Sequence, residues 1–455
     1  MSMATLGTLA EMAAGQIDAA NAAVAIAGVG TDTRTPLHGQ LFVALRGPRF
    51  DGHDHLGAAM EAGAAAVVVE GGAEVPQGLP PIRVDDTQLA LGRMGAAWRR
   101  SLQSIKVVAI TGTAGKTTTK DLLAAVCGAA VPSVASPRSF NNAIGVPLTI
   151  LAARPEDAVL VAEVGTSSVG EIAPLADMLA PDVSIVTLIG CGHLAGLGDI
   201  ASVAAEKYAL VEALGTSGLA LIRAGSPPAR RCTGRLETFG FELQADHRIT
   251  SRGPGWMKFE SRRWAVGLPG EHGAVNSLAA ILAARAVGIP EQAIADGLAA
   301  AEPSPHRMRS CMVGDVRVID DTWNANPESM AAVLAAVPEL DLHARRLVLV
   351  LGDMLELGES ATEHHRMVAP LLEQLAEQVT LHQLVLVGQE MEALADELSG
   401  RLTAIPVTYE PKSDEACMAR VTAQLRRGDT VLLKASRGIG LERILTHLES
   451  GALAS

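Results

Sequence analysis

Short apolar runs alternate with longer alanine-rich segments along most of the chain. Runs rich in β-branched residues or leucine are typical of buried strands, whereas the alanine-rich segments have helical patterns. The predicted strands are residues 39–45, 64–70, 107–110, 158–162, 183–187, 218–222, 347–352, 384–388 and 431–434. The predicted helices are residues 54–63, 87–102, 121–127, 203–214 and 276–287. Strands and helices that alternate in this way predict an α/β fold with mostly parallel sheets.

The pattern predicts three domains. Residues 1–104 are expected to form a small α/β domain, residues 105–311 a central, doubly wound and mostly parallel sheet, and residues 312–455 a Rossmann-like domain. Residues 223–269 are richer in arginine, glycine and polar groups, which predicts short antiparallel strands and loops.

The composition narrows the class of protein. Aromatic residues make up only 3% of the chain, so the cores must be built from small aliphatic residues, which favours α/β layers. The net charge of −13, with no basic stripe, argues against a nucleic-acid partner. The five cysteines are far apart and form no C-x-x-C, which indicates a reducing compartment and no structural zinc. With neither a secretory signal nor an apolar run of the roughly 18–20 residues that span a membrane, we expect a cytoplasmic protein.

The segment after residues 107–110 has the composition of a phosphate-binding loop. It reads Thr-Gly-Thr-Ala-Gly-Lys-Thr-Thr (111–118) and lies between a predicted strand and a predicted helix. Its glycines let backbone N–H groups converge on phosphate oxygens, and the helix N-terminus adds the positive end of its dipole. Lys116 supplies a charge for the terminal phosphates, and the Thr117 hydroxyl can bind magnesium. Ile110 replaces the first glycine of the full motif, so this is a shortened variant that predicts ATP or GTP binding; the alternative is a glycine-rich turn with an exposed lysine.

Three further residues are candidates for chemistry, each with a structural alternative. Glu163 directly follows residues 158–162, where a carboxylate can hold magnesium or its waters, or simply face solvent. His193 lies among glycines on a loop, so it either approaches a ligand or is an ordinary loop histidine. Lys207 lies in a predicted helix and, taken alone, is expected to be a solvated surface lysine.

Two amide-rich segments are also candidates. Residues 140–148 read as a compact loop with Asn141 and Asn142, which either bind phosphate or substrate or serve as turn residues. Residues 320–327 combine acids, amides and Trp323, which fits a nucleotide base or ribose contact, or a turn. The ends of the last three predicted strands, including residues 434–438, are expected to offer a second surface for phosphate or carboxylate.

Together these stretches resemble the Mur ligase family, the ATP-dependent amide-bond-forming enzymes of peptidoglycan precursor synthesis. The resemblance extends over nearly the whole chain, and the loop at 111–118 is similar to the family form G-x-x-G-K-T. Residues 141–148, 320–327, 351–358 and 434–437 resemble members that join D-alanyl-D-alanine to UDP-N-acetylmuramoyl-tripeptide. Residues 31–34, 39–45 and 51–53 look like the family's uridine-nucleotide-binding domain.

The resemblance implies roles for individual residues. Lys116, Lys207 and His193 would be catalytic. The residues that would bind ATP are Gly112, Thr113, Ala114, Gly115, Lys116, Thr117, Thr118, His272, Asn276, Arg307, Asp321, Asn324 and Asn326. The magnesium ligands would be Thr117, Glu163, His193 and Lys207, the last as a carbamate, which replaces its interpretation as a surface lysine. The substrate-binding residues would be Thr31, Asp32, Thr33, Arg34, Asn141, Asn142, Lys434 and Arg437.

The chain departs from the family pattern at several positions. Leu188 replaces an asparagine, Thr166 and Ser167 replace Asn-His, Trp323 replaces a tyrosine, and Ala209 replaces a glutamate. These changes affect substrate contacts and support of the metal site, while the central ATP and magnesium set is kept.

The resemblance implies that ATP phosphorylates the tripeptide carboxylate and that the dipeptide amine then attacks the acyl phosphate, in an enzyme that we expect to be a monomer. One alternative is a relative that adds a single amino acid, such as a diamino acid, or a folate polyglutamylating enzyme; the Asp-Asn-Pro-Arg signature of the diamino-acid enzyme is absent. Others are a non-catalytic nucleotide-binding relative and a metabolite kinase.

Overall fold

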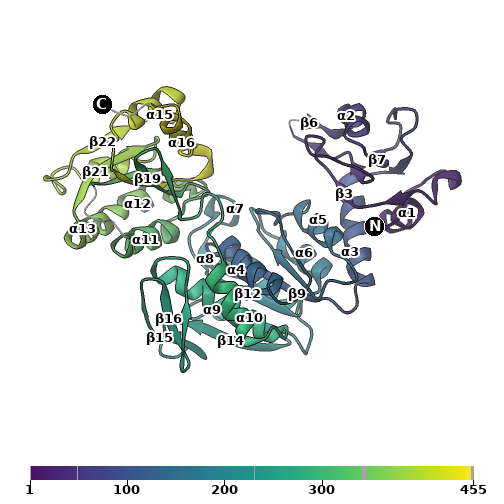
Figure 1. Ribbon diagram of the computed structural model, residues 1–455, viewed down its shortest axis with the longest axis horizontal. Helices are drawn as coiled ribbons and strands as arrows, with labels where there is room; N and C mark the ends of the chain where they lie inside the picture. The colour runs from purple at the N-terminus through teal and green to yellow at the C-terminus, as the bar shows by residue number, and fades with distance from the viewer. Residues whose placement is uncertain (1, 49, 230, 341–345, 452–455) are drawn as a thin grey trace.

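The computed structural model describes residues 2–48, 50–229, 231–340 and 346–451. Three α/β units follow one another along the chain, as the sequence pattern predicts, and each contains its own sheet. In Figure 1 the N-terminal unit lies at the upper right and the C-terminal unit at the upper left, with the central unit below and between them. Among the described helices, none is both long enough and apolar enough to cross a membrane.

The N-terminal unit contains a four-stranded sheet in the order β3-β4-β7-β8, in which all neighbours are parallel. Its elements are β1 (Ala4–Thr5), α1 (Leu6–Ala13), β2 (Ala25–Ile26), β3 (Val29–Gly30), β4 (Leu41–Val43), β5 (Arg46–Gly47), β6 (Phe50–Asp51), α2 (Leu56–Glu61), β7 (Ala66–Glu70), β8 (Pro81–Val84) and α3 (Thr87–Ser101). Helix α3 extends from this unit and packs on the central one, where the Trp98 indole donates a 3.0 Å hydrogen bond to the carbonyl of Ala153. Helix α3 therefore anchors the N-terminal unit.

The central unit is a nine-stranded sheet in the order β10-β11-β9-β12-β13-β14-β15-β16-β17. Its elements are β9 (Lys106–Thr111), α4 (Lys116–Gly128), β10 (Ser133–Ala135), α5 (Gly145–Ala152), β11 (Val159–Glu163), α6 (Ile172–Leu179), β12 (Val183–Val186), α7 (Leu194–Leu197), α8 (Ile200–Glu212), β13 (Leu219–Arg223), β14 (Arg235–Gly240), β15 (His247–Gly253), β16 (Trp256–Phe259), β17 (Arg262–Ala265), α9 (Gly270–Ala286) and α10 (Glu291–Ala300). The strands from β10 to β13 are parallel, as predicted.

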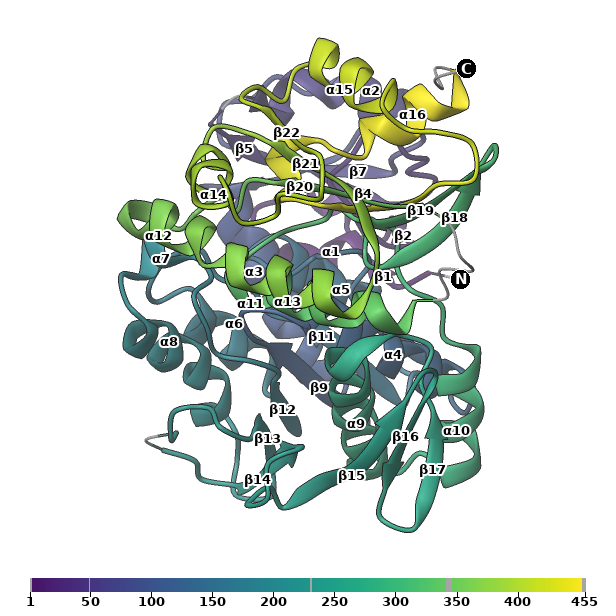
Figure 2. The same ribbon diagram turned by 90° about the vertical axis from the view of Figure 1, so that its left-hand side faces the viewer.

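The prediction of antiparallel strands for residues 223–269 is wrong in part. Strands β14 and β15 continue the parallel sheet from β13, and only the pairs β15–β16 and β16–β17 are antiparallel. The polar composition of this region reports that several of its side chains are exposed, which does not fix the direction of a strand. Figure 2 shows these last strands beside α9 and α10.

The strand order reverses at β9, in the middle of the parallel part of the sheet. The chain runs from β9 out to β10, returns to β11 on one side of β9 and then crosses to β12 on the other. The register places Glu163 of β11 beside Ile110, and Val186 of β12 beside Thr111. In open α/β sheets, ligands bind outside the carboxyl ends of the strands at such a reversal. The segment at 111–118 begins at this edge.

The C-terminal unit contains a six-stranded sheet in the order β18-β19-β23-β20-β21-β22, in which only β18 is antiparallel. Its elements are β18 (Arg309–Val313), β19 (Val316–Asp321), α11 (Pro327–Ala336), β20 (Leu347–Gly352), α12 (Ala361–Arg366), α13 (Val368–Gln378), β21 (Leu381–Val387), α14 (Glu392–Glu397), β22 (Val407–Glu410), α15 (Glu415–Thr422), β23 (Thr430–Lys434) and α16 (Arg443–Glu449). The expected boundary at residue 312 lies within β18. Asp321 ends β19 and is in register with Lys434 of β23.

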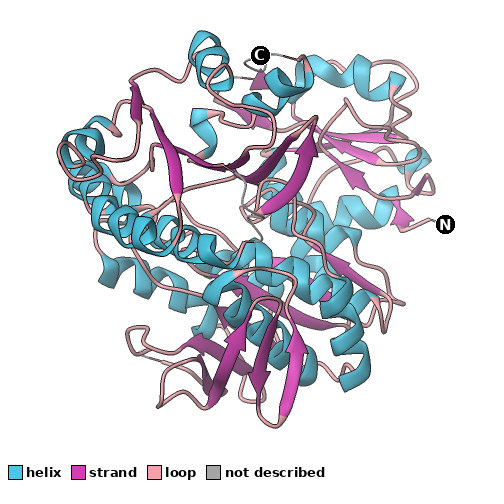
Figure 3. Cartoon of the chain, turned by 60° about the vertical axis from the view of Figure 1, so that its left-hand side comes forward, coloured by secondary structure: helices cyan, strands magenta, loops and turns pink. Residues whose placement is uncertain are grey.

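The apolar cores lie on both faces of the two large sheets, between strands and helices (Figure 3). Strand β9 buries Val107 and Ala109 on one face and Val108 and Ile110 on the other. A strand covered on both faces reads as a continuous apolar run, which is why these strands were visible in the sequence.

Candidate active site

The phosphate loop is held in place by its neighbours. Gly112 and Gly115 both have positive φ, a conformation that favours glycine. A side chain at Gly112 would overlap the Thr187 hydroxyl, and a Cβ at Gly115 would lie 2.7 Å from the Oδ1 of Asn276. The Thr187 hydroxyl donates a 2.5 Å hydrogen bond to the carbonyl of Ala114. The loop is therefore fixed between the end of β12 and helix α9.

Lys116 is the first residue of α4 and lies in the pocket beside this loop. Its Nζ donates a 2.7 Å hydrogen bond to the carbonyl of Gly112. Loss of hydration lowers the pKa of Lys116; the negative charges of Glu163 and Glu356 oppose this effect, and the positive charge of Arg307 adds to it. The amine is thus a charge donor inside the loop, as the sequence predicts.

Glu163 and Thr117 form an oxygen-rich site at the carboxyl ends of β11 and β9. The Thr117 hydroxyl donates to Oε2 of the buried Glu163 at 2.7 Å, and the Asn141 amide donates to Oε1 at 2.8 Å. The Ser139 hydroxyl lies 3.4 Å from that of Thr117. Carboxylate and hydroxyl oxygens are the ligands that Mg²⁺ prefers, and it commonly completes its shell with phosphate oxygens and water. The residues present therefore fit a magnesium ion held jointly with a nucleotide.

Lys207 lies on α8 and is almost completely buried, with 1% of its surface exposed. The expectation of a solvated lysine, drawn from the helical pattern alone, is wrong, because that face of α8 packs into the protein. Burial, together with the positive charge of Lys116, holds the pKa of Lys207 well below its usual range, while Glu206 acts in the opposite direction. The Glu206 carboxylate accepts hydrogen bonds from the backbone N–H groups of Gly170 (2.7 Å) and Ile172 (2.8 Å). This environment favours an uncharged amine, the form that can react with CO₂.

His193 lies just before the short helix α7, with a positive φ of 60°. Its Nδ1 is 2.7 Å from Oε2 of Glu356, which belongs to the C-terminal unit. His193 lowers the pKa of the Glu356 carboxyl, as Lys116 does more weakly, against partial burial that raises it. His193 therefore stands at the contact between two units and close to Lys116.

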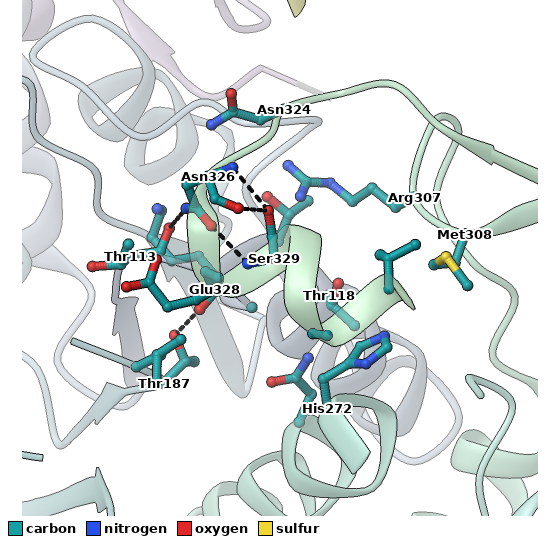
Figure 4. A pocket seen from close by; sticks show the side chains of 18 of the residues that line it. Thr113, Thr118, Thr187, His272, Arg307, Met308, Asn324, Asn326, Glu328 and Ser329 are labelled. Carbon is teal, nitrogen blue, oxygen red and sulfur yellow. Dashed lines mark hydrogen bonds between the residues drawn. The ribbon is translucent and has the colours of Figure 1, made fainter. Parts of the chain in front are cut away.

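A pocket of about 570 Å³ continues from the phosphate loop between α9 and α11 (Figure 4). Its far end is lined by Leu268, Val275, Ala331 and Ala332 together with His272. Nδ1 of His272 is buried and makes no hydrogen bond with a described residue, and burial lowers the pKa of this histidine. A small apolar slot with one unpartnered ring nitrogen suits a flat heterocycle that offers a hydrogen-bonding edge.

The C-terminal unit contributes Asp321 and Lys434 to this pocket from the ends of β19 and β23. The buried Lys434 Nζ donates to the Asp321 carboxylate at 2.6 Å and to the carbonyl of Asn324 at 2.7 Å. Asn326 is the N-cap of α11 and forms a reciprocal capping box with Ser329. These contacts shape the loop between β19 and α11 and hold Asn324 at its exposed tip.

Trp323 in the same loop lies between two guanidinium groups. Arg307 is 5.5 Å and Arg437 is 5.3 Å from the centre of its ring. Arg307 lines the pocket, whereas the exposed Arg437 also pairs with Glu442 at 3.1 Å.

The structure brings most of the predicted residues to one pocket. These are Thr113, Ala114, Gly115, Lys116, Thr117, Thr118, Asn141, Glu163, His193, His272, Asn276, Arg307, Asp321, Asn324, Asn326 and Lys434. The lining does not include Gly112, Lys207, Arg437, Asn142 and residues 31–34.

Asn142 and residues 31–34 have local roles in the structure. The Asn142 side chain accepts hydrogen bonds from the N–H groups of Ile144 and Gly145, where α5 begins, so residues 145–148 are helical rather than the predicted loop. Arg34 holds Asp32 through two hydrogen bonds (2.9 and 2.8 Å) and lowers the pKa of that carboxyl to about 2.

Sequence reasoning missed three residues of the site. Ser139 lines the pocket beside Thr117. Glu328 lines it from the first turn of α11, and Glu356 lies against His193. Glu356 stands within residues 351–358, which carried the family resemblance, but nothing in their local pattern indicates a partner in another unit.

Comparisons with known proteins agree with this architecture. Three family models match: the Mur ligase family catalytic domain over residues 25–99, the Mur ligase middle domain over 110–284, and the Mur ligase glutamate ligase domain over 306–437. UDP-N-acetylmuramoyl-tripeptide–D-alanyl-D-alanine ligase of Bacillus subtilis is 32% identical, with 94% of each chain covered. The enzyme of the same name from Escherichia coli is 31% identical, with 99% of each chain covered.

Solved structures give the same result. A crystal structure of MurF from Acinetobacter baumannii has a TM-score of 0.83 and 27% identity, covering 98% of this chain and 99% of that one. The MurF ligase of Thermotoga maritima in complex with ADP has a TM-score of 0.75 and 25% identity, covering 93% and 97%. The chain belongs to the Mur ligase family.

Proposed function

We propose that this chain is the ligase that joins D-alanyl-D-alanine to UDP-N-acetylmuramoyl-tripeptide with the energy of ATP. The proposal is supported by full-length relatives that bear this name and by a solved MurF structure that contains ADP. The observation that carries it is the convergence of Lys116, the Thr117–Glu163 oxygen pair and the buried Lys207 at the strand-order reversal of the central sheet.

The reaction must first activate a carboxylate, which an amine does not attack at neutral pH. The terminal carboxylate oxygen of the tripeptide attacks the γ-phosphorus of ATP, the bond to the β-phosphate oxygen breaks, and ADP leaves. Lys116 and the backbone of the loop hold the phosphates and compensate the charge that moves between them. A magnesium ion held by Thr117 and Glu163 would neutralise the crowded phosphate oxygens.

The second step forms the amide. The uncharged amine of D-alanyl-D-alanine attacks the carbonyl carbon of the acyl phosphate, the tetrahedral intermediate expels phosphate, and the amine loses a proton. Within this proposal, Lys207 acts as a carbamate, an anion that supports the metal site together with His193. His272, Asn276, Arg307 and the loop that contains Asn324 hold the nucleotide.

The two outer units supply the other substrates. We assign the UDP-sugar to the N-terminal unit with residues 31–34 and the incoming dipeptide to the C-terminal unit with Lys434 and Arg437. Closure of these units over the central one excludes water that would hydrolyse the acyl phosphate. We further propose that the enzyme works in the cytoplasm as a monomer.

The test is ATP-dependent phosphate release with UDP-N-acetylmuramoyl-tripeptide, with and without D-alanyl-D-alanine, and mass analysis of the product. Release that requires both substrates and yields the pentapeptide supports the proposal. Release that requires a free amino acid instead keeps the ligase chemistry and rejects the dipeptide. A phosphorylated product that persists in the presence of the dipeptide indicates a kinase.

A further inference from the structure

The C-terminal unit holds the segment around His193 from two sides. Oε1 of Glu328, in the first turn of α11, accepts a 2.5 Å hydrogen bond from the N–H of Cys191. The carbonyl of Glu356 accepts a 3.2 Å hydrogen bond from the N–H of Ala195. Residues 190–195 of the central unit are therefore clamped when the C-terminal unit is in the position seen here.

The Glu356 carboxylate makes the third contact of this clamp, with His193 itself. Its Oε2 lies 2.7 Å from Nδ1, which is buried and forms no aligned hydrogen bond with any described residue. Both residues have left-handed backbone conformations, with φ of 60° at His193 and 66° at Glu356. Such conformations cost about 1–3 kcal/mol and persist where the surrounding structure enforces them. Two constrained residues from different units thus face each other beside Lys116.

A carboxylate at one nitrogen of an imidazole fixes the ring and leaves the other nitrogen for a ligand. We infer that Glu356 is a positioning residue for the ligase reaction. It orients His193 toward the γ-phosphate and its magnesium ion only when the C-terminal unit is seated on the central unit. This inference rests on the proposed function, in which His193 serves the metal.

The consequence is a site that is completed by closure. Before closure, the His193 ring has no carboxylate to hold it, so the metal and the γ-phosphate are bound less firmly. After closure, the acceptor unit is already in place when phosphoryl transfer becomes fast. This order protects the acyl phosphate from water, because the intermediate forms in the closed state.

The experiment compares Glu356→Ala with Glu359→Ala in the full-length protein. Glu359 lies in the same loop, is exposed and makes no hydrogen bond or ion pair with a described residue, so its replacement removes the same charge without the contact. Mn²⁺ binding is titrated by electron paramagnetic resonance in the presence of β,γ-methylene ATP, which needs no turnover. We expect Glu356→Ala to weaken Mn²⁺ binding by about 10–100-fold and Glu359→Ala to leave it unchanged. Glu356→Gln should recover part of the loss, because its amide oxygen still accepts from Nδ1–H.

The double variant His193→Ala/Glu356→Ala separates positioning from a general structural effect. If Glu356 acts through His193, its removal adds little once the ring is gone. An equal loss in both backgrounds, or wild-type Mn²⁺ affinity in Glu356→Ala, would overturn the inference. Failure of the proposed function is distinguishable, since it would leave the wild type without ligase activity while the Mn²⁺ comparison still gives its own result.

Discussion

Replacing Lys434 with methionine tests whether this buried lysine organises the loop between β19 and α11. Its side chain is 3% exposed, and its Nζ bridges the Asp321 carboxylate and the carbonyl of Asn324. Methionine has a similar length and packs well in an apolar setting, so the substitution removes the charge while largely keeping the volume. It leaves Asp321 as a buried carboxylate without its cation.

The structure sets the expected magnitude. Removing one partner of a buried ion pair destabilises a protein by about 3–5 kcal/mol. Asp321 keeps a 2.9 Å hydrogen bond from the N–H of Met308, which places the expected loss at the lower end, about 3 kcal/mol. The double variant Asp321→Asn/Lys434→Met removes both charges and should recover about 2 kcal/mol, because no unpaired charge remains.

The assay is urea unfolding followed by amide hydrogen exchange in β19, β20 and β23, which reports on the C-terminal unit alone. With a urea dependence of about 1.5–3 kcal/mol/M, a loss of about 3 kcal/mol lowers the midpoint by about 1–2 M. A Lys434→Met midpoint equal to that of the wild type would refute the structural role of the ion pair. A double variant as unstable as the single one would show that the charge of Asp321 is not the cause.

Three further predictions concern the central unit. Lys116→Ala should lower turnover in the phosphate-release assay by about 10²-fold or more, the effect of losing one preorganised charge donor, and near-normal turnover would contradict the assignment of the loop. Removing dissolved CO₂ should lower activity and bicarbonate should restore it, whereas Lys207→Ala should be inactive in both conditions; intact-mass analysis under non-acidic conditions checks for the added CO₂. Because burial holds the pKa of His272 below the ordinary 6.5, the unfolded chain binds this proton more readily than the folded one, so stability should fall as the pH drops below 6.5. Urea titrations from pH 7.5 to about 5 should show a smaller fall for His272→Gln, and equal slopes would refute this reasoning.

Local patterns identified the parts of the site that lie on consecutive residues. The loop at 111–118 was found because a buried strand, two glycines and a helix start must follow one another directly to bind phosphate. Glu163 was found for a similar reason, since it stands at the end of an apolar run. In the strands from β14 to β16, the polar composition reported exposure and gave the wrong pairing direction for two of the three.

The sequence by itself determined the α/β class, the phosphate loop and the family, because buried parallel strands and a strand–loop–helix site are written in short, continuous stretches. Only the tertiary structure decided that Lys207 is buried, that Lys434 pairs with Asp321, and that Glu356 reaches His193. Each of these depends on which residues distant in sequence share a low-dielectric environment. Burial and charge pairing of that kind arise from the packing of whole sheets and units, and they leave no periodic signal in the segments that take part.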